Sequence, residues 1–328
     1  MHLKPAVIPG PFQQRVSAIG PGLLARFVLA SVPALLLGLW AVGLRSAAEL
    51  PSSWIDALAT GAALWLPRVL LALFVSVAWA VVFSRVRNRQ LDTGWLYLAW
   101  MFVLLLPAAT PLPLVVIGLS FGLLFGCHAF GGTGRYIVNP ALLGLVFLEM
   151  AYPAAMDHYG VAGASATSTW SLLAGGGPEA LFAAGITWRD VVLGLEVAVL
   201  GAPSAVLCLA GLGYLVARRL APWRLPVGAL AGLLAMAWLF GGQAWYWFPA
   251  LGSFTLALAF IACDPTTVPE SRAGQWSMGL LFGALTAILR TLNPDHPEGS
   301  LQALLLASLA APVIDHWAAL RRRDDQDD

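Results

Sequence analysis

The chain has 328 residues, of which 59% are hydrophobic and only 11% are charged, and its formal net charge is +1. A soluble globular domain carries about 25% charged residues, so this composition excludes an ordinary water-soluble protein and predicts an integral membrane protein. A net charge near zero without a basic face excludes nucleic acid as a partner and leaves the lipid bilayer as the expected surroundings.

The hydropathy pattern predicts an all-α polytopic membrane protein, because a helix needs about 20 apolar residues to cross a bilayer. We expect a single membrane domain over residues 22–318, between a cytoplasmic N-terminal segment (1–21) and a charged cytoplasmic tail (319–328). About ten transmembrane helices are predicted within it, at residues 22–44, 62–84, 95–110, 112–130, 140–156, 191–217, 225–242, 246–263, 276–291 and 299–318.

Arginine placement orients these helices. Groups of arginines follow the second, sixth and tenth predicted helices, at 85–89, 218–224 and 321–323. With ten helices and both termini in the cytoplasm, all three groups lie on the cytoplasmic side, as the positive-inside rule requires. Arg290 then falls on the outer side, beside several acidic residues.

The longest connection, residues 157–189, is therefore predicted to be extracytoplasmic, and loops of this length are commonly functional. Ten helices also divide into two sets of five with opposite orientations. An Asn-Pro turn precedes the last helix of each set, in "RYIVNPALLG" and "TLNPDHPEGS". We expect a five-plus-five inverted repeat, an architecture that places binding sites where the two halves meet.

The turn "GGTGR" interrupts two apolar runs with Gly131, Gly132, Thr133, Gly134 and Arg135. Glycine permits positive φ and lets the backbone approach a ligand closely, and an arginine can bind a phosphate or carboxylate with two hydrogen bonds. The same spacing also fits a tight turn between helices with one cytoplasmic arginine. Spacing alone leaves both interpretations open.

A second polar turn, "ACDPTTVPESRAGQW" (262–276), begins where the eighth predicted helix ends at Asp264. Thr266 or Thr267 could cap a short helix there. A contact with a cofactor or a partner is the alternative.

Charged residues inside apolar runs are costly and commonly mark a pathway or an interhelical pair. Glu196 and Arg68 lie deepest and are candidates for ion coupling, together with Glu149 nearer a helix end. Asp315 is expected to reach the membrane interface. We find no nucleophile–base arrangement and no metal-ligand cluster, and we expect Cys127, Cys208 and Cys263 to be buried small hydrophobes.

Three long strings carry a family resemblance: "FGGTGRYIVNPALLGLVFLEMAYPA", "FIACDPTTVPESRAGQWSMGLLFGALTAILR" and "LNPDHPEGSLQALLLASLAAPVIDHW". In this order they resemble the family of the B subunit of the sodium-translocating NADH:quinone reductase and the D subunit of the Rnf complex. The "AYP" and "NPDHPEG" segments are more similar to the quinone-reductase branch. The resemblance favours a site at the "GGTGR" turn, with Asn139 of the first string and Asp264 of the second among the cofactor-binding residues.

The resemblance implies a subunit of a multi-subunit, redox-driven ion pump in the bacterial inner membrane. It implies FMN joined by a phosphoester to an extracytoplasmic threonine, Thr167 here, by a flavin transferase. It also implies riboflavin and quinone sites in the same subunit.

Two stretches depart from the family pattern. Before Thr167, Val161 stands at the position of an aspartate, and Ala164 and Ser165 replace a serine and a glycine. Ala202 stands where the family has a glutamate. Three hypotheses therefore stay open: covalent FMN on Thr167, a divergent paralogue that binds flavin non-covalently or not at all and acts as an anchor or quinone-facing subunit, and a non-redox transporter.

Overall fold

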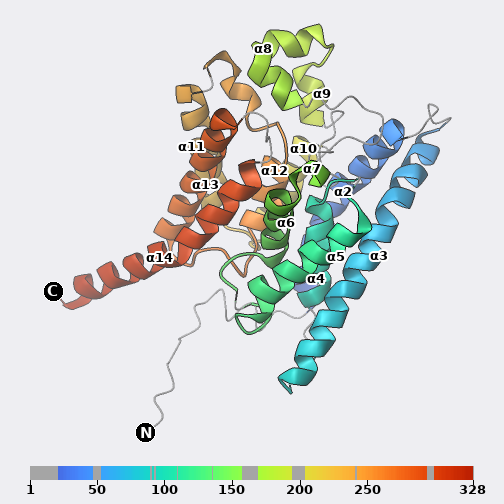
Figure 1. The fold of residues 1–328 in the computed structure, drawn as a ribbon. Helices are drawn as coiled ribbons and strands as arrows, with labels where there is room; N and C mark the ends of the chain where they lie inside the picture. Colours follow the sequence, from blue (N-terminus) through green and yellow to red (C-terminus); the bar gives the residue numbers. More distant parts are fainter. Residues whose placement is uncertain are drawn as a thin grey trace.

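The structure, a computed structural model, describes residues 21–46, 53–88, 91, 94–108, 110–134, 136–156, 169–193, 204–240, 242–293 and 299–327. Every regular element among these residues is helical, which confirms the all-α prediction (Figure 1). The elements are α2 (Pro21–Ser46), α3 (Trp54–Val86), α4 (Gly94–Leu105), α5 (Leu112–Phe121), η1 (Gly122–His128), α6 (Pro140–Ala151), α7 (Pro153–Met156), α8 (Thr169–Ala183), α9 (Trp188–Leu193), α10 (Ala205–Ala217), α11 (Arg224–Phe240), η2 (Gly242–Trp247), α12 (Phe254–Leu256), η3 (Ala257–Ala262), α13 (Arg272–Leu292) and α14 (Gly299–Asp327).

Two described helices are long and apolar enough to cross a bilayer by themselves: α2, through Ala25–Leu44, and α3. The α3 helix begins earlier than predicted, because Ser53 caps it by accepting a hydrogen bond from the Asp56 backbone N–H at 3.2 Å. Shorter apolar helices lie in five of the other predicted regions, at Gly94–Leu105, Leu112–His128, Pro140–Ala151, Ala205–Ala217 and Arg224–Phe240.

The prediction of one continuous helix at 246–263 is wrong. This region contains the 3₁₀ helix η2, then a turn with Gly252 at φ 65°, then the short pair α12–η3. The nine residues of α12 and η3 are all buried, and at 1.5 Å per residue they extend only about 14 Å. Broken helices are tolerated at membrane depth where surrounding protein covers them, and these are covered.

Two further predicted segments contain helices. The predicted connection 157–189 includes α8 and the first two residues of α9, and both helices lie at the top of the view in Figure 1. Gly177, at φ 67°, kinks α8 just before Pro178. The predicted tail 319–328 is helical as far as Asp327, because α14 continues through it.

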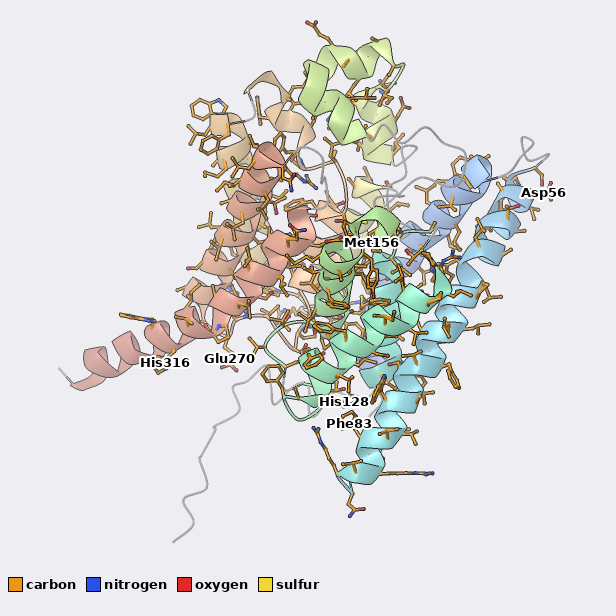
Figure 2. The ribbon with its side chains drawn as sticks, viewed as in Figure 1. Asp56, Phe83, His128, Met156, Glu270 and His316 are labelled. Atoms are coloured by element: carbon orange, nitrogen blue, oxygen red, sulfur yellow. The ribbon has the colours of Figure 1, made fainter. Side chains whose placement is uncertain are left out.

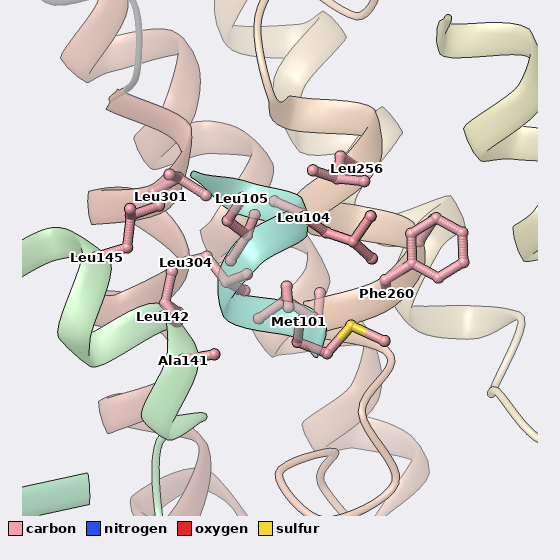
Figure 3. Packing of buried hydrophobic residues seen from close by; sticks show 14 of the residues in the cluster. Met101, Leu104, Leu105, Ala141, Leu142, Leu145, Leu256, Phe260, Leu301 and Leu304 are labelled. Carbon is pink, nitrogen blue, oxygen red and sulfur yellow. The ribbon is translucent and has the colours of Figure 1, made fainter. Parts of the chain in front are cut away.

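The helix α4 forms the centre of the core. Nine of its twelve residues are buried, which is the pattern of a helix surrounded by protein on all sides. Figure 3 shows its side chains packed between α6, α14 and η3. The residues in contact there include Met101, Leu104, Leu105, Leu142, Leu145, Phe260, Leu301 and Leu304.

Glycines bring α11 and α13 together at backbone distance. Each helix carries two glycines four residues apart, Gly228 and Gly232 on α11 and Gly279 and Gly283 on α13. A Cβ atom on Gly283 would lie 1.9 Å from the Ala229 carbonyl oxygen, and one on Gly279 would lie 2.3 Å from that of Leu225. Small residues at this spacing permit the closest helix packing in membranes.

Gly283→Ala is therefore expected to destabilise the folded chain by about 1–3 kcal/mol, as overpacking does elsewhere. The matched control is Gly213→Ala in α10, where an added Cβ meets nothing within 4 Å. That control is expected to stabilise α10 by about 0.5–1 kcal/mol, because alanine restricts the unfolded chain. Thermal unfolding of the purified chain in detergent measures both. Equal melting temperatures for the two variants would contradict this close packing.

Candidate functional site

Both polar turns follow π-helical segments. The helix α5 widens into η1, where the Ala129 N–H donates to the Leu124 carbonyl at 2.9 Å, and "GGTGR" comes next. The η3 segment likewise ends immediately before Cys263 and Asp264. Short π-helical segments occur frequently at functional sites, so the local geometry marks the same two turns that the sequence singled out.

The "GGTGR" turn has the predicted glycine conformation. Gly131, Gly132 and Gly134 have φ of 111°, 106° and 81°, which confirms that the turn needs glycine at these positions. Thr133 rests on the first residue of α4, since a Cβ on Gly94 would lie 2.3 Å from the Thr133 Cγ2 atom. The turn therefore covers the N-terminus of the central helix. Arg135 lies outside the described residues.

Gly132→Ala tests whether the positive φ at this position requires glycine, because the added methyl group would not collide with any neighbouring atom. A Cβ at Gly132 meets nothing within 4 Å, but φ is +106°, so strain alone is expected to cost about 1–3 kcal/mol. Thermal unfolding should detect this loss. An unchanged melting temperature would mean that the turn relaxes to another backbone conformation.

The structure joins Asn139 to Asp264, two predicted site residues that lie 125 positions apart in the chain. The Asn139 Nδ2 atom donates to the Asp264 Oδ2 atom at 2.7 Å, and both side chains are buried. The Asn139 Oδ1 atom caps α6 by accepting from the Ala141 N–H at 2.9 Å and the Leu142 N–H at 3.4 Å. The cap fixes the amide oxygen on α6, so its NH₂ group is directed to the carboxylate.

The second carboxylate oxygen of Asp264 organises its own turn. Its Oδ1 atom accepts from the Thr266 N–H at 3.0 Å and from the Thr266 hydroxyl at 2.7 Å. The expected threonine cap is not what begins α13. Ser271 caps that helix instead, by accepting from the Gly274 N–H at 2.8 Å. Asp264 thus fixes the turn, and Ser271 starts the helix.

The sequence predicts that Asp315 reaches the membrane interface. In the structure its carboxylate instead links α14 to this turn. It accepts from the backbone N–H groups of Glu270 at 2.9 Å and Ser271 at 3.2 Å, and from the Ser271 hydroxyl. Partial desolvation and, secondarily, the negative charge of Asp315 raise the pKa of Glu270. In Figure 2, Glu270 lies close to the stretch of α14 that carries His316.

The predicted ion-pathway residues do not gather at this site. Arg68 donates from Nε to the Thr110 carbonyl at 2.9 Å and also to the Leu64 carbonyl. Thr110 follows the C-terminal end of α4, whereas the "GGTGR" turn covers its N-terminal end. Glu149 is half-buried on α6, and Glu196 lies outside the described residues, as does Thr167.

Sequence reasoning missed two structural contacts. Arg290, expected on the outer side of the membrane, is buried, and its guanidinium donates to the carbonyls of Phe248 and Leu251 at 2.8 Å each. At the end of α3, Phe83 stacks on His128 with ring centroids 4.1 Å apart, and these two residues lie together in Figure 2.

The three cysteines, Cys127, Cys208 and Cys263, are buried, as predicted. Among the described residues, no group of His, Cys, Asp or Glu has the arrangement of a metal site. In the part of the chain that the structure describes, the polar groups of functional interest are therefore the buried side chains of Asn139 and Asp264, whose hydrogen bond joins the two turns. We call this contact the junction of the two turns.

Comparisons with known proteins identify relatives of this chain. A sequence model of the NQR2, RnfD, RnfE family matches residues 14–323. The chain is 35% identical over 323 residues to the B subunit of the Na(+)-translocating NADH-quinone reductase of Azotobacter vinelandii, covering 92% of this chain and 80% of that protein. The corresponding B subunit of Pseudomonas aeruginosa (strain LESB58) is 37% identical over 290 residues, covering 83% and 72%. The chain therefore belongs to the NQR2, RnfD, RnfE family.

Proposed function

We propose that the chain is a membrane subunit of an ion-translocating oxidoreductase complex, in which it passes electrons through flavin toward quinone or a partner subunit. Electron flow would be coupled to movement of Na⁺ or H⁺. Relatives named as the B subunit of the Na(+)-translocating NADH-quinone reductase support this class of complex. The observation that carries the proposal for the site is the buried hydrogen bond from Asn139 to Asp264.

The proposed membrane architecture is ten helices in a five-plus-five inverted repeat. Helices at equivalent positions of the two halves should meet across a two-fold axis. In support, α2 packs on α10, α6 on α14 and α4 on η3, which are the first and sixth, fifth and tenth, and third and eighth predicted helices. Contacts within the halves also correspond, since α3–α5 matches α11–α13 and α4–α6 matches η3–α14.

The cofactor site would then lie at the interface of the halves, where inverted repeats commonly bind ligands. Asn139 belongs to the first half and Asp264 to the second. The glycines of "GGTGR" allow close backbone approach, Thr133 supplies a hydroxyl, and Arg135 is proposed to bind an anionic group of the cofactor. The flavin supplies the electron chemistry, and the chain supplies its orientation and surroundings.

Thr167 is proposed as the attachment point of a covalent FMN on the extracytoplasmic side, placed there by a flavin transferase. The altered sequence before it, with Val161, Ala164 and Ser165, favours the second candidate: a paralogue that uses only non-covalent flavin at the junction. Glu196, Arg68 and Glu149 remain proposals for the ion pathway, and both termini are proposed to be cytoplasmic in the bacterial inner membrane.

The proposed function is tested by complementation. The gene would replace that of the B subunit in a bacterium with a sodium-translocating NADH:quinone reductase, and NADH-driven ²²Na⁺ uptake would be measured in inverted membrane vesicles. Uptake restored by this chain supports the proposal. Assembly of the complex without uptake would support an anchoring paralogue, and Na⁺ flux that does not need NADH would support a transporter.

A further inference from the structure

Arg68 carries a positive charge that the described part of the chain does not neutralise. It is half-buried on α3, and its guanidinium donates from Nε to the Thr110 carbonyl at 2.9 Å and from Nη1 to the Leu64 carbonyl. Within the described residues these two carbonyls are its hydrogen-bond partners, and no carboxylate pairs with it. A guanidinium has five N–H donors, so three remain. A charge in an apolar run is costly without a partner, which indicates an anionic ligand.

The side chain of Arg68 extends toward the outer end of α3. Helical side chains tilt toward the N-terminus of their helix, and the contact with Leu64, one turn before Arg68, shows this direction here. Thr110 follows the C-terminal end of α4. Under the proposed topology, the N-terminal end of α3 and the C-terminal end of α4 both face the extracytoplasmic side. The guanidinium therefore points away from the cytoplasm.

The length of α3 places Arg68 near the outer boundary of the hydrocarbon core. Arg85, in the last turn of the same helix, belongs to the arginines predicted to lie on the cytoplasmic side. The distance along the helix from residue 68 to residue 85 is about 26 Å at 1.5 Å per residue, and the hydrocarbon core is about 30 Å thick. The long side chain of Arg68 can therefore reach the level of the outer head groups.

The surface around Arg68 is one that lipid can reach. The helix α3 lies at the edge of the molecule in Figure 1. Leu66 and Leu70, on either side of Arg68 in the sequence, are exposed, as is Leu112 at the start of α5. In addition, α5 begins just after Thr110 without a side-chain cap, and the positive end of a helix favours an anion nearby. A ligand with a phosphate group and acyl chains fits this combination.

We propose that Arg68 binds the phosphate group of a phospholipid in the outer leaflet, whose acyl chains lie on the exposed apolar surface of α3 and α5. The planar guanidinium matches the oxygens of a phosphate, so its remaining N–H groups donate to them. The depth favours a lipid over an acidic side chain of a partner subunit, because lipid head groups lie at this level all around the protein. This role differs from one in the ion pathway, and the experiment distinguishes the two.

The test compares Arg68→Gln with Arg189→Gln, a control that removes a charge from an exposed position on α9. The full-length proteins would be purified in detergent, stripped of lipid and titrated with dioleoylphosphatidylglycerol, with bound lipids counted by native mass spectrometry. Arg68→Gln is expected to bind this lipid about tenfold more weakly than the wild type, and Arg189→Gln is expected to bind it equally well. Arg68→Lys keeps the charge and is expected to lose less affinity than Arg68→Gln.

Two further probes identify the recognised group in the wild type, and they decide the matter even if Arg68→Gln fails to fold. Dioleoylglycerol has the same acyl chains without the phosphate, and glycerol phosphate has the phosphate without the chains. Both are expected to bind much more weakly than the phospholipid. Equal binding of dioleoylglycerol would overturn recognition of the phosphate, and equal binding of glycerol phosphate would replace the lipid with a soluble anion.

Three other results would overturn the assignment. Unchanged phospholipid affinity in a folded Arg68→Gln chain would remove Arg68 from any lipid site. The same result together with reduced ²²Na⁺ uptake by the assembled complex would place Arg68 in the ion pathway instead. A wild-type chain that binds no phosphatidylglycerol would leave the guanidinium to an acidic residue of a partner subunit.

Discussion

Asp264→Leu is expected to destabilise the folded chain by about 2–4 kcal/mol and to abolish quinone reductase activity of the assembled complex. The leucine would leave the Asn139 amide, the Thr266 N–H and the Thr266 hydroxyl without the acceptor that now pairs them. Asn139 cannot compensate by turning its amide, because its oxygen caps α6. Thermal unfolding and NADH-driven quinone reduction measure the two effects.

The matched control for this variant is Asp190→Leu. Asp190 accepts the same two kinds of hydrogen bond, from the Thr187 N–H at 2.9 Å and the Thr187 hydroxyl at 2.6 Å, but at an exposed position on α9. Water can replace the lost acceptor there, so the control should lose much less stability and keep its activity. Equal losses in both variants would contradict a special role for the buried junction.

Thr167→Val is expected to abolish covalent flavin completely. A phosphoester needs the threonine oxygen, and valine keeps the shape of the side chain without it. The denatured protein, expressed with an active flavin transferase, would be inspected on a gel for flavin fluorescence, with Thr169→Val as the neighbouring control. A fluorescent wild type and Thr169→Val with a dark Thr167→Val would support attachment at Thr167.

A dark wild-type band would have the opposite meaning, provided that the transferase modifies another substrate in the same cells. It would exclude covalent FMN on this chain. The site at the junction of the two turns would then carry the whole flavin chemistry, as the second candidate function requires.

The sequence predicted the helical class and the glycine turn because both depend on local chemistry. Apolar runs form helices in lipid since their backbone groups must pair internally, and three glycines within four positions indicate positive φ. Asn139 and Asp264 could each be identified as candidates through the family resemblance of the strings that contain them. Their hydrogen bond could not, because hydropathy and spacing carry no information about a contact across 125 residues.

The prediction for 246–263 failed for a related reason. A run of apolar residues has the same hydropathy whether lipid or protein surrounds it, so the buried pair α12–η3 resembled part of a continuous membrane helix. Gly252, which breaks the run with a positive φ, is one glycine among 33 in the chain.

The flavin content of the purified full-length chain tests the central claim most directly. The chain would be expressed with the flavin transferase, purified in detergent with riboflavin and FMN supplied, and analysed before and after denaturation. We predict flavin released from the wild type on denaturation, and much less from Asp264→Leu examined at a temperature where it stays folded. A folded wild-type chain with no flavin in either fraction would contradict an electron-carrying subunit.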